Sequence, residues 1–185
     1  MDRIIEYLYD KYLGSDTQVR KYLSIHSVKV YEKALQIMEL NPDKIFDTGL
    51  VFYGSMLHDI GVIFVDAPEI GCYGKHPYIC HGYLGRKIMK KEGLKKIAKI
   101  CERHVGVGLS KEEILNHNLP LPKRDMLPLS LEEKLICLAD KFYSKSSGKL
   151  EMEKSIEQIR KSILKYGDDK LEKLNELLSF FRLIN

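Results

Sequence analysis

Six histidine and aspartate side chains fall within stretches of the sequence that are otherwise apolar. They are His26, His58, Asp59, His81, His104 and Asp140. A buried carboxylate is costly unless a cation or several hydrogen bonds offset its charge. Neutral imidazole nitrogens and carboxylates are suitable ligands for Mn, Fe, Zn, Ni or Mg. A single histidine on a helix face is more often a core residue with a hydrogen-bond partner, but the six together predict a metal site.

Helical spacing places these residues on apolar faces. His26 lies three residues after Leu23 and four before Val30, which puts the three side chains on one stripe. His58 and Asp59 end the apolar segment 50–57, and Asp140 directly follows the apolar run 135–139. An acidic residue near a helix C-terminus opposes the helix dipole, and a nearby cation would offset that cost. Ligands carried inward on several helices are a known way to build a metal site in a bundle.

Almost every segment has the periodicity of a helix, so we expect an all-α fold with the metal site in its core. Helices are predicted near 3–13, 17–40, 43–60, 77–92, 94–105, 110–116, 130–145, 151–166 and 169–182. Two irregular stretches, 61–76 and 117–129, are rich in glycine or proline. Loops of this length are often functional.

Cap residues suggest where the helices begin and end. Thr17 or Asp16 caps the second helix, Asp43 opens the third, and Gly61 ends it in a left-handed conformation. Capping-box spacing predicts two further starts, at Ser110 with Glu113 and at Ser130 with Glu133.

The chain of 185 residues is long enough to bury one core, and its 44% hydrophobic and 30% charged residues are typical of a globular protein. We predict a helical bundle over 1–148 and a helical pair over 149–185 packed on the same domain. This pair carries apolar positions at helical spacing, which could instead meet a second copy of the chain in a homo-oligomer. A net charge of +4 is compatible with a phosphorylated substrate but too small to predict nucleic-acid binding.

The four cysteines form no C-x-x-C pair, and free thiols in a reducing cytoplasm are the simplest interpretation. Cys101 and Cys137 lie on or beside apolar stripes, so we expect both to be buried and slow to react. No signal peptide is recognisable, and no apolar stretch approaches the roughly 18 residues needed to cross a bilayer. These features predict a cytoplasmic protein that does not bind a membrane.

The order of the six residues resembles the H…HD…D signature of the HD-domain superfamily of metal-dependent phosphohydrolases. His58-Asp59-Ile60-Gly61 matches its H-D-I-G variant letter for letter, and His26-Ser27-x-x-Val30 resembles the first motif. His81-Gly82-x-x-Gly85 and Glu102-Arg103-His104 resemble the segments that supply further histidines in two-metal members. The resemblance covers roughly residues 20–145. Val62 stands where many members carry a lysine or arginine, so the cation that meets the substrate phosphate would be missing or would come from elsewhere in the chain.

The resemblance implies how such a centre would work. Asp59 would bridge two divalent metals, Mn, Fe, Ni, Co, Zn or Mg. His26, His58 and Asp140 would hold one ion, and His81 and His104 would help to hold the second. A bridging water with a lowered pKa would attack phosphorus in line.

Three cations are candidates for binding the substrate phosphate, namely Lys141, Arg103 and Arg124, each with a solvated surface cation as the alternative. Lys141 is also assigned to the catalytic group because it adjoins Asp140. His76 is the candidate for protonating the leaving group, with an exposed loop histidine as the alternative.

The function expected from the resemblance is hydrolysis of a phosphomonoester or phosphodiester in a small, nucleotide-type molecule. Dinucleoside polyphosphates, nucleoside monophosphates and cyclic nucleotides all fit. Three alternatives remain open at this point. The same scaffold could hold a di-iron oxygenase, it could bind a nucleotide without catalysis, or the helical tail could make the chain an interaction protein.

Overall fold

The computed structural model describes residues 2–15, 17–144 and 150–184. Over these residues the fold is all-α, as predicted, with one hairpin of two-residue strands, β1 (Asp66–Ala67) and β2 (Cys72–Tyr73). The α-helices are α1 (Arg3–Leu13), α2 (Gln18–Glu39), α3 (Thr48–Leu57), α4 (His81–Lys91), α5 (Lys95–Arg103), α6 (Lys111–Asn116), α7 (Leu131–Ala139), α8 (Ile156–Leu164) and α9 (Asp168–Phe180). The 3-10 helices are η1 (Ile60–Phe64), η2 (Pro68–Ile70), η3 (Tyr78–Cys80) and η4 (Asp140–Phe142).

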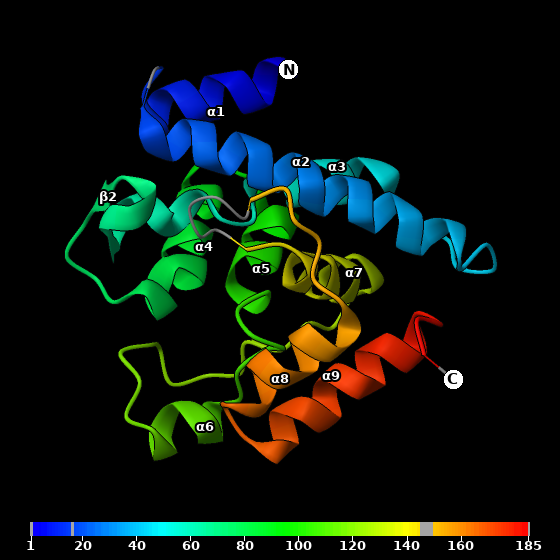
Figure 1. Cartoon of the computed structure of the whole chain (residues 1–185). Coiled ribbons are helices and arrows are strands. Elements are labelled where there is room, and N and C mark those ends of the chain that lie inside the picture. The colour runs from blue at the N-terminus through cyan, green and yellow to red at the C-terminus, as the bar shows by residue number, and fades with distance from the viewer. Residues whose placement is uncertain (1, 16, 145–149, 185) are drawn as a thin grey trace.

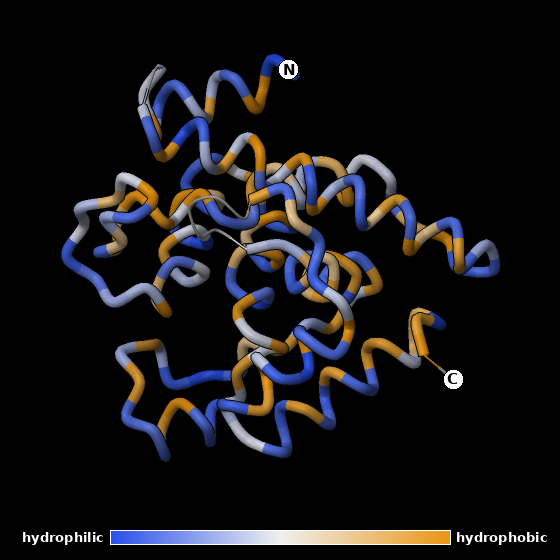
Figure 2. Tube along the Cα trace, in the orientation of Figure 1, coloured by the Kyte–Doolittle hydropathy of each residue, from blue (hydrophilic) through white to orange (hydrophobic). Residues whose placement is uncertain are grey.

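The helices are arranged in layers. Figure 1 shows α1 and α2 along one side of the molecule, α8 and α9 along the opposite side, and α5 and α7 between them. Apolar and polar residues alternate along the helices in Figure 2, as expected of helices that bury one face. None of the helices within the described residues is long and apolar enough to cross a membrane.

Helix caps confirm part of the predicted boundaries. The Thr17 hydroxyl accepts a hydrogen bond from the backbone N–H of Arg20 and caps α2, whereas Asp16 lies outside the described residues. Both predicted capping boxes are present, at the start of α6 and at the start of α7. A third box, Ser155 with Gln158, starts α8 at Ile156, five residues later than predicted.

The predicted helix 43–60 was wrong at both ends. The carboxylate of Asp47, not Asp43, caps α3 by accepting a hydrogen bond from the N–H of Leu50 at 2.9 Å. Asp43 instead pairs with Arg182 at 2.8 Å. At the other end α3 stops at Leu57 and the chain tightens into η1. The helix predicted over 130–145 likewise ends at Ala139 and continues as η4.

Gly61 does not end a helix in a left-handed conformation. It lies inside η1, and its φ is not among the positive values of the chain. A Cβ at this position would stand 2.1 Å from the carbonyl oxygen of His81 and 2.3 Å from the backbone nitrogen of Gly85. The missing side chain therefore allows η1 to pack directly against α4.

The C-terminal helices pack on the rest of the chain. Apolar residues of α8 and α9, among them Ile159, Leu174 and Leu178, are buried in one cluster with α7 residues such as Leu135 and Leu138. The apolar stripe that suggested a homo-oligomer is thus covered within the chain itself.

All four cysteines are free and buried. Burial raises the pKa of Cys137 to about 11 and raises that of Cys101 further. We therefore predict that Cys101 and Cys137 resist alkylation in the folded protein, since the thiolate is the reactive form. Labelling with iodoacetamide at pH 8, followed by mass spectrometry, measures this. Native-state labelling of both thiols at the rate of the urea-unfolded chain would contradict the prediction.

A partly buried ion pair joins α6 to α9. Glu113 contacts the ammonium of Lys170 and accepts a hydrogen bond from the N–H of Ser110 at 2.6 Å. Burial alone would raise the pKa of Glu113, but Lys170 and the Ser110 backbone lower it from 4.5 to about 2. A lowered carboxyl pKa stabilises the fold above the unfolded-state value, and this contribution is lost as the pH falls through 4.5 towards 2.

Glu113→Gln should therefore destabilise the protein by about 1–2 kcal/mol at neutral pH and by progressively less as the pH falls below the ordinary glutamate value. Urea unfolding across this pH range measures the difference. Glu112→Gln, an exposed neighbour in the first turn of the same helix, is the matched control. A loss that is equal for both variants would contradict the role given to the ion pair.

Candidate metal centre

The six predicted ligand residues converge in the core, most of them at the ends of helices. His58 follows the last residue of α3, and Asp59 follows it just before η1. His104 directly follows α5, and Asp140 begins η4 directly after α7. His81 is the first residue of α4, while His26 lies within α2. The six side chains belong to residues with relative exposures of only 0–7%.

Backbone carbonyls orient three of the histidine rings. Nδ1 of His58 lies 2.7 Å from the oxygen of Ser55, Nδ1 of His81 lies 2.7 Å from that of Tyr78, and Nδ1 of His104 lies 2.8 Å from that of Cys101. A carbonyl oxygen only accepts, so each Nδ1 carries the proton. In its neutral form each ring therefore turns the lone pair of Nε2 towards the centre, which is the usual orientation of histidines that bind metals.

The inward-facing atoms form two groups that share Asp59. His26, His58, Asp59 and Asp140 form the first group, and Asp59, His81 and His104 the second, each within 4.8 Å. Oδ2 of Asp59 lies 3.4 Å from Nε2 of His26 and 3.2 Å from Nε2 of His58. Its Oδ1 lies 3.3 Å from Nε2 of His81 and 3.2 Å from Nε2 of His104. One carboxylate thus presents a different oxygen to each group, which suits a bridging ligand.

The geometry requires a cation or a proton between the rings of the second group. Nε2 of His81 and Nε2 of His104 are 3.0 Å apart, and both rings already donate their Nδ1 proton to a carbonyl. Two neutral rings in this arrangement would direct their lone pairs at each other. A divalent metal accepts both lone pairs, and the buried carboxylates offset its charge. The residues present therefore fit a divalent metal.

Burial and charge affect the histidine pKa values in opposite directions. Burial alone would lower the pKa of His58, but Asp59 and Asp140 raise it to about 9. Burial lowers the pKa of His104 to about 3, which keeps that ring neutral. Neutral imidazole is the form that binds a metal, so metal binding would release the proton held at His58.

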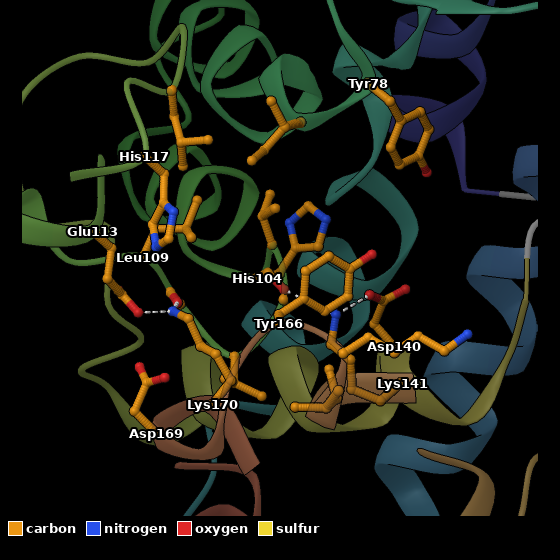
Figure 3. Close-up of a pocket in the computed structure, with 18 of the residues that line it drawn as sticks. Tyr78, His104, Leu109, Glu113, His117, Asp140, Lys141, Tyr166, Asp169 and Lys170 are labelled. Atoms are coloured by element: carbon orange, nitrogen blue, oxygen red, sulfur yellow. Dashed lines mark hydrogen bonds and ion pairs between the residues drawn. The ribbon is translucent and has the colours of Figure 1, made fainter. Parts of the chain in front are cut away.

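Lys141 is the predicted substrate-binding residue that the fold brings to the centre. Its ammonium donates hydrogen bonds to Oδ2 of Asp140 at 2.7 Å and to the carbonyl of His104 at 3.1 Å. A cavity of about 720 Å³ opens beside it and reaches His81, His104 and Asp140. Figure 3 shows Asp140, Lys141 and His104 together at this cavity.

Three other predicted residues lie away from the cavity. The guanidinium of Arg103 donates to Glu133 at 2.7 Å, and that of Arg124 pairs with the buried Glu102. His76 is exposed, and its backbone pairs with Phe64 and Asp66. Neither guanidinium nor the His76 ring is among the groups lining the cavity.

The sequence offered no signal for several residues that do line the cavity. They are Tyr78, Glu113, His117, Tyr166, Asp169 and Lys170. Tyr166, Asp169 and Lys170 belong to the C-terminal helical pair, whose pattern indicated only packing. A contact across the fold leaves no trace in local periodicity.

The division into two groups predicts what single ligand changes do. His81→Ala or His104→Ala should lose the second ion and leave the first largely bound, because only Asp59 serves both groups. Metal per chain is measured by elemental analysis, and circular dichroism confirms folding. His76→Ala, an exposed histidine outside both groups, is the control and should keep the wild-type content. Equal loss of both ions from folded His81→Ala protein would contradict this division.

Comparison with known proteins identifies the family. The HD domain model matches residues 23–144. The chain is 38% identical over 131 residues to the uncharacterized protein MJ0778 of Methanocaldococcus jannaschii, a match that covers 70% of this chain and 68% of that protein. No solved structure matches the chain.

Two further relatives are tRNA (cytidine(56)-2'-O)-methyltransferases. That of Thermoplasma volcanium is 30% identical over 170 residues, covering 91% of this chain and 44% of that protein. That of Picrophilus torridus is 34% identical over 120 residues, covering 64% of this chain and 30% of that protein. The chain thus spans less than half the length of these two relatives. The matched segment 23–144 contains all six inward-facing histidines and aspartates, and the chain belongs to the HD-domain superfamily of metal-dependent phosphohydrolases.

Proposed function

We propose that this protein is a metal-dependent phosphohydrolase that cleaves a phosphoester in a small, nucleotide-type substrate. Two groups of candidate ligands share Asp59 at the wall of a cavity, and Lys141 lines the same cavity. This arrangement is the main support for a hydrolase. A cavity of about 720 Å³ is of the size that small-molecule ligands occupy.

The bound metal would supply an activated water and neutralise charge on the phosphoryl oxygens. The residues of the chain would do the rest. Asp59 would hold the two metal positions at a fixed separation, and its charge would offset theirs. His58, His81 and His104, fixed through Nδ1, would keep their Nε2 atoms directed at those positions. Lys141 would bind a phosphoryl oxygen, because its ammonium is held beside Asp140 at the cavity wall.

The names of the relatives support an inference about the substrate of this chain but not about its reaction. Two of them are named for a reaction on a tRNA cytidine, which favours a nucleotide-type substrate here. More than half of each of those proteins lies outside the match. Methyl transfer is therefore not carried over to this chain.

A screen of phosphoesters tests the proposal. The chain would be assayed against nucleoside monophosphates, cyclic nucleotides and dinucleoside polyphosphates with Mn, Co, Ni or Fe, and with EDTA as the metal-free control. We expect hydrolysis of at least one class, abolished by EDTA and restored by metal. Metal-loaded protein that hydrolyses none of them would contradict the proposal, and oxygen consumption by an iron-loaded sample would point to an oxygenase instead.

A further inference from the structure

Two cavities meet at the metal centre. The first is the cavity of about 720 Å³ described above, and the second has a volume of about 450 Å³. Both are lined by Tyr78, Asp140, Lys141 and Tyr166. The ligand Asp140 and the cation Lys141 therefore stand at the junction, and a molecule bound at the centre can extend in two directions.

The first cavity suits a nucleobase. Apolar side chains, among them Ile79, Leu109 and Leu119, line its walls. Figure 3 shows a polar group at the far side, Glu113, His117, Asp169 and Lys170, with Asp140 and Lys141 on the opposite side. Apolar walls with a few polar groups at one end match a planar ring whose edge carries donors and acceptors.

The second cavity is polar. Its walls include Lys154, Ser144 and Ser162, beside the residues shared with the first cavity. The ammonium of Lys154 donates a hydrogen bond to the carbonyl of Tyr143 at 3.4 Å, which keeps it at this wall. Hydroxyl and ammonium groups suit a polar alcohol, such as a sugar, better than an aromatic ring.

Two tyrosines flank the junction from different parts of the chain. Tyr78 precedes α4, and its ring lies tilted against that of His81 with centroids 4.7 Å apart. Tyr166 stands between α8 and α9 and is 76% exposed. Tyr166 also lies outside the segment 23–144 that matches the HD domain model.

We propose that the substrate is a phosphodiester that lies across the centre, with its nucleoside in the first cavity and a polar alcohol in the second. Tyr166 is then a specificity-determining residue that contacts the bound diester at the junction. This inference rests on the proposed hydrolase function. A monoester would fill the first cavity alone.

The reaction balances as a simple hydrolysis. The oxygen of one water forms a new bond to phosphorus, and the bond between phosphorus and the alcohol oxygen breaks. One proton of the water ends on that alcohol oxygen. The products are a nucleoside monophosphate, which leaves from the first cavity, and a free alcohol, which leaves from the second.

The test compares a diester with a monoester. The glycerol ester of thymidine 5′-monophosphate is the diester, and thymidine 5′-monophosphate is the monoester with the same nucleoside, with chromatography of the products as the readout. We expect kcat/KM of the metal-loaded full chain to be at least about tenfold higher for the diester. Tyr166→Ala should raise KM for the diester about tenfold, because the ring would lose its contact with the alcohol portion at the junction, and should change KM for the monoester less than about twofold. Tyr166→Phe should restore the wild-type KM.

A matched control and a binding measurement complete the test. Tyr73 is 77% exposed and lines neither cavity, so Tyr73→Ala should leave all values unchanged. Calorimetric titration of a slowly hydrolysed phosphorothioate form of the diester should show the same tenfold loss in Tyr166→Ala.

The possible failures are distinguishable. Equal or better hydrolysis of the monoester, or phosphorothioate binding that Tyr166→Ala leaves unchanged, would overturn the diester inference and leave the hydrolase proposal standing. Hydrolysis of neither ester with any metal would count against the hydrolase proposal, and calorimetry would still decide whether the diester binds across the junction.

Discussion

Asp59→Asn should reduce hydrolysis by at least about 10³-fold, in line with the several kcal/mol that metal activation supplies. The substitution keeps the shape of the side chain but removes the negative charge that both ligand groups share. Two ions at these positions would repel each other with less compensation, so the second should be lost first. Turnover of the best substrate from the phosphoester screen and metal content per chain measure the two effects.

The stability of the Asp59→Asn protein distinguishes a bridging role for this carboxylate from a purely structural role. Asp59 is 1% exposed, and removal of its charge ends both the cost of burying that charge and its attraction to His58, so the metal-free protein should stay folded. Asp66→Asn changes an exposed aspartate seven residues away and is the control, with wild-type turnover expected. Near wild-type turnover in Asp59→Asn would exclude a bridging role for this carboxylate.

Gly61→Ala should destabilise the protein by about 3 kcal/mol or more, because the added methyl group meets backbone atoms that cannot move independently. Those atoms, the oxygen of His81 and the nitrogen of Gly85, lie at 2.1 and 2.3 Å from the new Cβ. Relief of the clash would push η1 away from α4. Since η1 follows Asp59 and α4 begins with His81, the two ligand groups would separate.

Urea unfolding and metal content measure both consequences. Gly49→Ala is the control, because its Cβ would meet only the Asp47 carboxylate at 3.6 Å, which is ordinary contact, and alanine favours the helix that contains it. We expect Gly49→Ala to be neutral or slightly stabilising. A Gly61→Ala protein with wild-type stability and full metal content would show that η1 and α4 can separate without cost.

The sequence predicted the helical class and the inward faces well, because periodicity reports directly on burial. His26 between Leu23 and Val30 is one such case, and Asp140 after an apolar run is another. The pairing of these residues into two groups came from the family resemblance, since helical spacing does not say which helices meet.

Predictions from the sequence were wrong where a residue's role depends on contacts between distant segments of the chain. The guanidiniums of Arg103 and Arg124 are held by Glu133 and Glu102, and no local pattern says which carboxylate an arginine will meet. Gly61 was predicted to end a helix because it follows a helical segment. The structure instead explains the glycine by the close approach of α4, which leaves no room for a Cβ. Tyr166 was missed because the helical spacing of its segment predicts only packing. It does not predict that the turn between the two helices directs this side chain towards the metal centre.

The metal content of the purified protein shows whether the six buried histidines and aspartates form a metal centre. Full-length chain would be purified without chelator or affinity metal, and its transition metals measured per chain by elemental analysis. We predict between one and two equivalents, or uptake to that level when Mn, Fe or Ni is added. Less than about a tenth of an equivalent, with no uptake of any of these metals by folded protein, would contradict it.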